Sequence, residues 1–301
     1  MLLTQLCLMH TRSLQAARRS PSTVTYYGYA LEPLHKFLLE RGHTGEISEI
    51  DRHLLAEFQL WLRDSRGMGP GGEHAVLRGV RAVFRWAVAE ELLDRNPTLR
   101  LSMPNIRHEP PPAVQPEEVN ACLKVAATLA RPARSRALML TLYDTGIRQG
   151  ELLALTVDSV DFNTGMITVN AATSKSRKRR VVPFGIRTGK ALSRYLRVER
   201  HPSLPVIDRL FLNRSGEPMT PGGLAHLLLT IGAQAGLPRD HTAPHAWRRG
   251  MAVQYLRQGG DLFSLQQILG HTTLEMTRRY VRYLPDDLQR EHMRASPVDR
   301  L

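Results

Sequence analysis

The stretch NPTLRLSMPNIRHEPPPAVQP, residues 96–116, decides the architecture of this 301-residue chain. Proline fixes φ and lacks a backbone N–H, so it interrupts helices and sheet interiors, and three consecutive prolines favour an extended linker. The chain is also long enough to bury two separate hydrophobic cores. We therefore expect a linker at 106–113, between a first domain at 1–105 and a second domain at 114–301.

The region before the linker is predicted to be helical. From Leu2 to about Glu91 the apolar residues recur every three or four positions, which is the spacing of one helix face. Glycine and proline in GMGPGG, residues 67–72, separate two of these segments. We expect a compact domain of four or five helices, built on the sets Leu31, Leu34, Phe37 and Leu38, then Leu54, Leu55, Phe58, Trp61 and Leu62, then Val80, Val83, Phe84 and Val88.

The region after the linker combines helix and strand patterns. Residues 115–127 begin a helix with proline and glutamate in its first turn, and residues 134–146 form another that stops at Gly146. GMITVNA and RVVPF then alternate as strands do, which predicts a hairpin over 165–184. From residue 221 the pattern is helical again. The predicted fold class is mainly α with a small β-sheet (α+β).

The charge of the chain indicates a polyanionic partner. Lysine plus arginine number 41 against 28 acidic residues, and the sequence pI is near 10.4, so nucleic acid is the simplest partner. Cys7 and Cys122 lie far apart without a CxxC pattern, which argues against a disulfide framework and against a thiolate metal site. The sequence has no signal peptide pattern and no long apolar run. We expect a cytoplasmic protein with no membrane contact.

Two segments carry arginine and lysine in unusual settings. In DTGIRQGELLAL, residues 144–155, Arg148 and Glu151 are three positions apart and share a helix face, either as an ordinary surface ion pair or as part of a site. TSKSRKRRVVPF, residues 173–184, places Lys175 and Lys178 in the predicted hairpin turn, although the chain has only five lysines against 36 arginines. The pKa of lysine can be lowered enough for proton transfer, which arginine does not permit. The turn is therefore a candidate for a general acid as well as for phosphate contacts.

Two later segments carry histidine, arginine and tyrosine. Pro244 predicts a helix start that places His245 and Arg248 on one face, where a phosphate would be favoured. His241 and His245 are spaced as zinc ligands, but Pro244 opposes one continuous helix through both.

In LGHTTLEMTRRYVRY, residues 269–283, Gly270 predicts a helix end. Thr272 and Glu275 predict a capping box that starts a second helix bearing Tyr280 and Tyr283. His271 would lie in the turn, so that His271 and Tyr280 can face one site; the alternative is that Tyr280 is a packed core aromatic.

These four segments, in this order, resemble the tyrosine recombinase family of phage integrases and Xer-type recombinases. The family pattern is an arginine in TGxRxxEL, a lysine on a β-hairpin, HxxR, LGH, and a tyrosine nine residues after the last histidine. The chain departs from the pattern at Arg249, where the family often has histidine. The matching residues are Arg148 in TGIRQGEL, Lys175 in TSKSRKRRVVP, His245 and Arg248 in HAWR, His271 in LGH, and Tyr280.

The resemblance implies a helical SAM-like core-binding domain, a catalytic domain and a chemical mechanism. Tyr280 would attack a DNA phosphodiester and form a 3′-phosphotyrosine intermediate, so that no cofactor and no metal are needed. Arg148 and Arg248 would hold the non-bridging phosphate oxygens. Lys175 would protonate the leaving 5′-oxygen, with Lys178 as the competing candidate.

The remaining implied roles are supporting ones. His245 would act in acid/base support, His271 would donate a hydrogen bond to the phosphate, and Glu151 would hold the arginine or the histidine in place. The implied partner is double-stranded DNA, with two protomers on each site and four in the synapse, alone or with a second recombinase.

Three functions fit these residues. The leading hypothesis is a site-specific DNA recombinase or integrase located with the nucleoid in the cytoplasm. The alternatives are a type IB topoisomerase-like enzyme, which the two-domain size argues against, and a catalytically inactive accessory DNA-binding protein. Simple DNA binding has no chemical need for Lys175 together with Tyr280, which argues against the accessory role. The target sequence does not follow from these motifs, because base readout depends on groove contacts.

Overall fold

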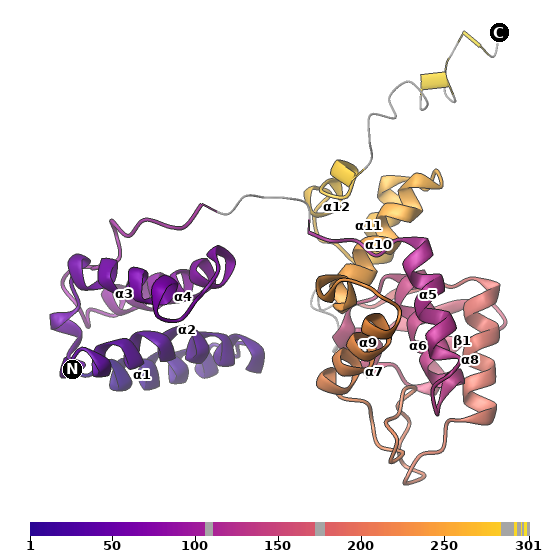
Figure 1. The fold of residues 1–301 in the computed structure, drawn as a ribbon, viewed down its shortest axis with the longest axis horizontal. Helices are drawn as coiled ribbons and strands as arrows, with labels where there is room; N and C mark the ends of the chain where they lie inside the picture. Colours follow the sequence, from indigo (N-terminus) through magenta and orange to yellow (C-terminus); the bar gives the residue numbers. More distant parts are fainter. Residues whose placement is uncertain (106–110, 172–177, 284–291, 294–295, 297, 300–301) are drawn as a thin grey trace. The chain divides into compact units, whose positions relative to one another are not determined.

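The computed structural model describes residues 1–105, 111–171, 178–283, 292–293, 296 and 298–299 (Figure 1). Internal contacts divide the chain into two compact units, Met1–His108 and Glu109–Leu301. This division falls within the segment expected to be a linker. Residues 106–110 of that segment lie outside the described residues, so the linker bounds of 106–113 stay a prediction.

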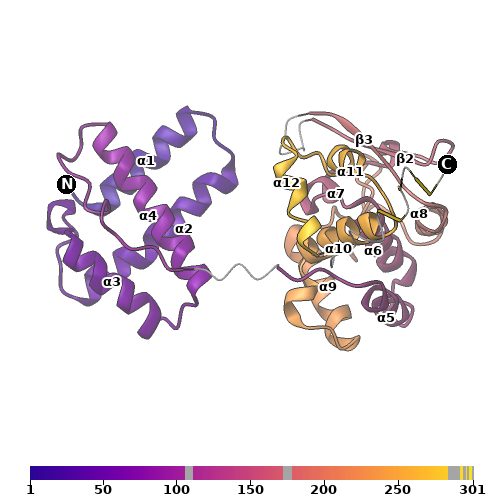
Figure 2. The ribbon, with the colours of Figure 1, turned by 90° about the horizontal axis from the view of Figure 1, so that it is seen from above.

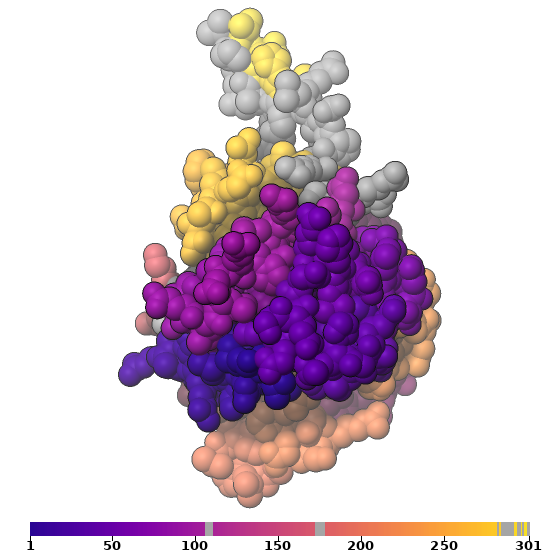
Figure 3. Space-filling model, turned by 90° about the vertical axis from the view of Figure 1, so that its left-hand side faces the viewer, coloured from indigo at the N-terminus to yellow at the C-terminus, as the bar shows by residue number. Residues whose placement is uncertain are grey.

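The first unit is helical, as its sequence spacing predicts. Its core contains every residue of the expected apolar sets except Val88, which is half-buried and outside the core cluster. The rings of Phe37, Phe58 and Trp61 are in mutual contact there. Figure 3 shows the continuous surface of this unit. Its elements are α1 (Leu3–Ala16), α2 (Pro21–Glu40), the 3-10 turn η1 (Ile47–Glu49), α3 (Arg52–Asp64) and α4 (Pro70–Ala89).

Local signals start these helices. The Ser20 hydroxyl accepts a hydrogen bond from the N–H of Thr23 at the beginning of α2, and the Asp51 carboxylate accepts two from the first turn of α3. Such caps satisfy backbone donors that have no partner within the helix. Pro70 opens α4 at a position where the missing N–H costs nothing.

The second unit combines helices with one small sheet (Figure 2). In the described residues its helices are α5 (Pro116–Ala126), α6 (Pro132–Thr145), α7 (Gln149–Ala154), α8 (Ile186–Val198), α9 (Pro221–Gln234), α10 (Pro244–Arg257), α11 (Leu262–Leu269) and α12 (Glu275–Arg278), with 3-10 turns η2 (Val157–Ser159), η3 (Arg239–Thr242) and η4 (Val281–Tyr283).

The sheet contains the predicted hairpin. β2 (Met166–Val169) pairs antiparallel with β3 (Arg180–Pro183), with Met166 opposite Pro183 and Val169 opposite Arg180. A third strand, β1 (Val160–Asp161), pairs with β2 and was not predicted, because two residues are too few for an alternating pattern. The sheet order is β1-β2-β3, so the mainly α fold with a small β-sheet is confirmed.

Helix α6 lies at the centre of the second core. Nearly all its residues from Ala133 to Leu142 are buried, and it packs against α5, α8 and α10. A helix that is buried on most of its faces is enclosed by other elements, and its buried polar side chains, such as Thr141, bond to the backbone. Its end at Gly146, in the left-handed conformation with φ 58°, is therefore fixed inside the domain rather than at its surface.

Gly250 on α10 marks a close approach between backbones. A Cβ added there would overlap the carbonyl oxygen of Val114 and lie 3.0 Å from Cε2 of Tyr143. The Gly250→Ala substitution should therefore lower the free energy of unfolding by about 1–3 kcal/mol, because overpacking outweighs the better helix propensity of alanine.

Urea unfolding followed by circular dichroism measures this effect, with Gly222→Ala as the control. Gly222 is also helical, but a Cβ added there meets nothing within 4 Å. The control should leave stability unchanged or raise it by up to about 1 kcal/mol. Equal stability of the two variants would show that Val114 and α10 are not packed as described.

Candidate active site

Two glycine-terminated helices bring their carbonyl ends to one buried arginine. The guanidinium of Arg248, on α10, is 4% exposed. It donates hydrogen bonds to the carbonyl oxygen of Gly146 and, at 2.7 Å, to that of Leu269. These carbonyls belong to the ends of α6 and α11, which the helices themselves leave without partners. Burial, followed by the charge of Arg148, lowers the pKa of Arg248 to about 10, so the group stays charged at neutral pH.

Arg148 lies at the start of α7, two residues after Gly146. Its backbone N–H donates to Oε2 of Glu151 at 2.8 Å, and its Nη1 donates to Oε1 at 3.0 Å. Its Nη2 also donates to the carbonyl oxygen of Gly270 at 3.4 Å. The predicted approach of Arg148 to Glu151 is confirmed. Because Glu151 is only 1% exposed, this contact is a buried ion pair and not a surface one.

Arg180 is a site residue that the sequence analysis missed. From β3 it donates to both oxygens of Glu151, at 2.9 Å and 2.7 Å, and through Nε to the carbonyl oxygen of Ile268 at 3.0 Å. The sequence did contain a signal: Arg180 alternates with the fully buried Val182, so it occupies an inward position of its strand. Inward arginines in strands need an anionic partner.

Glu151 thus joins two arginines from different elements. Burial alone would raise the pKa of its carboxyl group. The hydrogen bonds from Arg180 and from the backbone of Arg148 outweigh burial and hold the pKa below its usual range. The carboxylate is therefore ionised at neutral pH and fixes the guanidinium of Arg148.

His271 lies in the turn after α11, as predicted. Its Nε2 is 3.1 Å from Nη2 of Arg248, and its Nδ1 is 2.9 Å from the Thr277 hydroxyl. Arginine is only a donor, so Nε2 accepts and Nδ1 carries the proton. Burial, with the charge of Arg248 next in size, lowers the pKa of His271 to about 3, so the ring is neutral. In this arrangement Nε2 is an acceptor, so it could donate to a phosphate only after Arg248 releases it and it gains a proton.

Tyr280 is 7% exposed and its ring stacks on that of His271, with centroids 6.0 Å apart and planes 15° apart. The expectation that Tyr280 lies on the second helix is wrong, because α12 ends at Arg278 and Tyr280 follows in a turn. The expected capping box is also absent: Leu274 occupies the N-cap position without a side-chain cap. Thr277, near the C-terminal end of α12, contacts His271 through its hydroxyl and accepts the Tyr280 N–H with its carbonyl oxygen.

Tyr283 points to another part of the domain. Its hydroxyl donates to the carbonyl oxygen of Pro111, and burial raises its pKa. Unlike Tyr280, it belongs to no described contact with Arg148, Arg248 or His271. The two tyrosines thus pack against the same apolar cluster but differ in their ring and hydroxyl contacts.

The remaining predicted site residues are His245 and the two candidate lysines. Pro244 begins α10, as predicted, and His245 lies in the first turn with an exposed side chain, while Arg248 one turn later is buried. Lys175 lies outside the described residues, whereas Lys178 is described and exposed.

His241, one of the two histidines spaced as zinc ligands, has a different partner in the structure. His241 pairs with Glu118 at 2.8 Å and lies in η3, outside α10. Within the described residues, no group of three or more histidine, cysteine or acidic side chains is arranged to hold a metal. Also within those residues, no helix is long and apolar enough to span a membrane.

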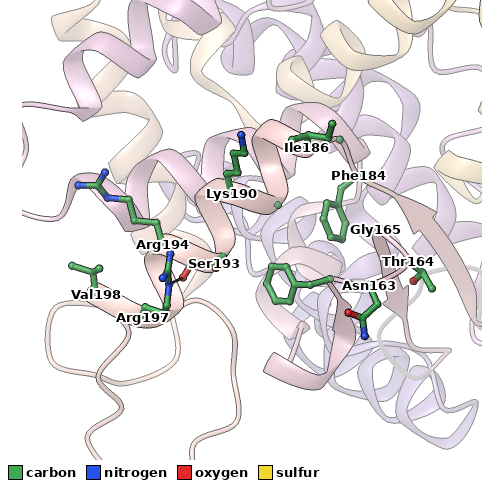
Figure 4. Close-up of a pocket in the computed structure, with 13 residues that line it drawn as sticks. Asn163, Thr164, Gly165, Phe184, Ile186, Lys190, Ser193, Arg194, Arg197 and Val198 are labelled. Atoms are coloured by element: carbon green, nitrogen blue, oxygen red, sulfur yellow. Dashed lines mark hydrogen bonds between the residues drawn. The ribbon is translucent and has the colours of Figure 1, made fainter.

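A separate hollow of about 910 Å³ lies beside α8 (Figure 4). It is lined by Phe184, Ile186 and Lys190, with Asn163 and Thr164 opposite them. Of the predicted site residues that the structure describes, none lines it. The cluster around Arg248 is therefore distinct from this hollow.

Both units match domain models of phage integrases. Residues 112–286 match the model of the phage integrase family, and residues 5–102 match the phage integrase SAM-like domain. Tyrosine recombinase XerD of Pseudomonas putida is 31% identical, with 85% of each chain covered. Tyrosine recombinase XerC of Lacticaseibacillus casei is 29% identical, covering 92% of this chain and 93% of the relative.

Solved structures share the fold. The integrase of transposon Tn1549, in complex with a circular intermediate DNA, aligns with a TM-score of 0.76 at 21% identity and covers 96% of this chain and 99% of that chain. A lambda integrase dimer bound to a COC′ core site aligns with a TM-score of 0.73 at 17% identity, covering 92% and 97%. The family model spans more than half of the chain, and the chain therefore belongs to the phage integrase family, the tyrosine recombinases.

Proposed function

We propose that the chain is a site-specific recombinase that cleaves and rejoins double-stranded DNA through a 3′-phosphotyrosine intermediate on Tyr280. The observation that carries this proposal is the meeting of Arg148, Arg248, His271 and Tyr280, which come from separate segments of the chain. Two arginines held by carbonyls and a carboxylate form a preorganised cationic site for a phosphate.

The chemistry assigned to the site conserves bond energy. The Tyr280 oxygen attacks phosphorus, its proton passes to His245, and the bond from phosphorus to the 5′-oxygen breaks. Lys175 donates a proton to that leaving oxygen. Arg148 and Arg248 stabilise the charge that develops on the non-bridging oxygens. The free 5′-hydroxyl of another strand then reverses these steps, so rejoining needs no nucleotide cofactor.

The assembly proposed for this reaction has two protomers on each DNA site and four in the synapse, either of this chain alone or with a second recombinase. The lambda integrase dimer bound to a core site supports a dimer on DNA. The net charge of +13 favours DNA as the partner. The proposed place of action is the cytoplasm, in association with the nucleoid.

A nicked suicide substrate tests Tyr280. The chain should form a covalent adduct in the presence of EDTA, because the arginines rather than a metal ion supply the positive charge. Tyr280→Phe should abolish the adduct, and peptide mapping should place it on Tyr280 rather than Tyr283. An adduct in Tyr280→Phe, or loss of the wild-type adduct on chelation, would refute this mechanism. Tight DNA binding without any adduct would favour the accessory role, and relaxation of supercoiled DNA by a monomer would favour a topoisomerase-like enzyme.

A 5′-thio substrate identifies the general acid. Lys175→Ala should slow cleavage of the ordinary substrate by about 100-fold or more, because the leaving oxygen lacks a proton donor. Cleavage of the 5′-thio substrate should be nearly unaffected, since a thiolate leaves without protonation. Lys178→Ala is the matched control and should change neither rate strongly. If Lys178→Ala, and not Lys175→Ala, slows only the ordinary substrate, then Lys178 is the general acid.

The low pKa of His271 predicts a pH dependence of stability. The folded-state pKa of about 3 lies below the usual value, so the unfolded chain binds more protons as pH falls towards 3. Stability from neutral His271 is therefore complete above about pH 6.5 and is lost on acidification. Between pH 7 and pH 5, wild type should lose about 1 kcal/mol more than His271→Gln, after allowance for solvent screening. If the free energy of unfolding, measured with urea, changes equally with pH in both proteins, His271 is not a neutral, buried ring.

A further inference from the structure

Residues 111–115 lie along α10 as an extended strap. The Val114 N–H donates to the carbonyl oxygen of Ala246 at 3.1 Å, and Nε of Arg249 donates to that of Pro112 at 2.6 Å. Gly250 leaves room for the strap, because any Cβ there would overlap Val114. The strap therefore meets α10 at consecutive turns, at Ala246 and at Arg249.

The same strap also contacts the segment that follows the nucleophile. The Tyr283 hydroxyl donates to the carbonyl oxygen of Pro111, and the Tyr283 N–H donates to that of Tyr280 at 3.1 Å. Arg257, on α10, reaches Gln115 with Nη1 at 3.1 Å and the Tyr283 carbonyl with Nη2 at 3.5 Å. The strap is thus hydrogen-bonded both to α10 and to Tyr283, three residues after Tyr280.

The residue types suit this arrangement. Proline lacks an N–H and favours extended backbone, in which the carbonyl oxygens have no partner along the chain. The carbonyls of Pro111 and Pro112 are therefore acceptors for donors from outside, and Arg249 and Tyr283 provide them. Burial lowers the pKa of the half-buried Arg249, and the neighbouring Tyr283 acts in the opposite direction.

The Tyr280 turn needs such support because its own helices are short. α12 has four residues and η4 has three, and helices of this length do not hold themselves in water. Stacking on His271 contacts one side of Tyr280. The hydrogen bond from the Tyr283 hydroxyl to Pro111 anchors the chain three residues later.

We propose that Arg249 and Tyr283 are positioning residues that clamp the strap and thereby hold the Tyr280 hydroxyl in line for attack on the phosphate. This inference rests on the proposed phosphotyrosine chemistry. It also assigns a use to Arg249, which stands where the family often has histidine. A displaced strap would leave DNA contacts intact and misplace only the nucleophile.

The test compares single-turnover adduct formation on the nicked substrate at saturating protein. Tyr283→Phe and Arg249→Met each remove the donor and keep most of the side-chain volume. Both should slow adduct formation by about tenfold or more, since small misplacements of a reacting group are costly. The dissociation constant for DNA should stay within about twofold, which a general loss of folding would not allow.

Two variants serve as matched controls. Arg249→Lys keeps a charged donor and should restore most of the rate. Tyr143→Phe removes a hydroxyl that is buried without a hydrogen-bond partner among the described residues, and this tyrosine lies beside the same helix. It should behave as wild type. Rates for Tyr283→Phe and Arg249→Met equal to that of Tyr143→Phe would overturn the proposal, and so would a loss confined to DNA affinity.

Hydrogen exchange without DNA separates this proposal from the chemistry. The N–H groups of Tyr280 and Tyr283 are hydrogen-bonded, at 3.0 Å and 3.1 Å, so peptides covering 275–283 report the order of the turn. Their exchange should accelerate in Tyr283→Phe and in Arg249→Met but not in Tyr143→Phe. Unchanged exchange would overturn the proposal that the strap acts as a clamp, whatever the adduct assay gives. A failure of the phosphotyrosine chemistry would instead be seen as an adduct that still forms in Tyr280→Phe.

Discussion

The burial of one guanidinium organises the second domain. Arg248 loses nearly all its water, and such a charge is tolerated only with several hydrogen-bond partners. The carbonyls of Gly146 and Leu269 provide them, and the same contacts satisfy the ends of α6 and α11. One residue therefore holds the ends of two helices together. The positions of Arg148 and His271, each a short distance along the chain from those ends, follow from this constraint.

The carboxylate of Glu151 extends the arrangement to the sheet. It binds Arg148 at the start of α7 and Arg180 on β3, so the sheet is attached to the arginine that we propose to bind the phosphate. A network of this kind is costly unless every member is paired, and here each charge has a partner. The neutral ring of His271 adds a hydrogen-bonding group without adding to the positive charge.

Some features could be predicted because their cause is local. Gly146 and Gly270 end helices through a left-handed backbone, and Pro244 starts one through its fixed φ, so neighbouring residues suffice to predict them. The prediction of a Thr272 capping box failed because α12 begins only at Glu275, with Leu274 as its N-cap residue and no side-chain cap. Arg180 was missed because its partner Glu151 lies 29 residues away.

The sequence by itself determined the two domains, the helical periodicities, the hairpin and the family, since these depend on spacing, proline, glycine and residue type. Only the tertiary structure decided that Arg180 joins the cluster through Glu151 and which contacts hold the two tyrosines. Tyr280 stacks on His271, whereas the Tyr283 hydroxyl donates a hydrogen bond to Pro111. The physical reason is that α12 and η4 are too short to set their own geometry, so contacts with distant segments set it.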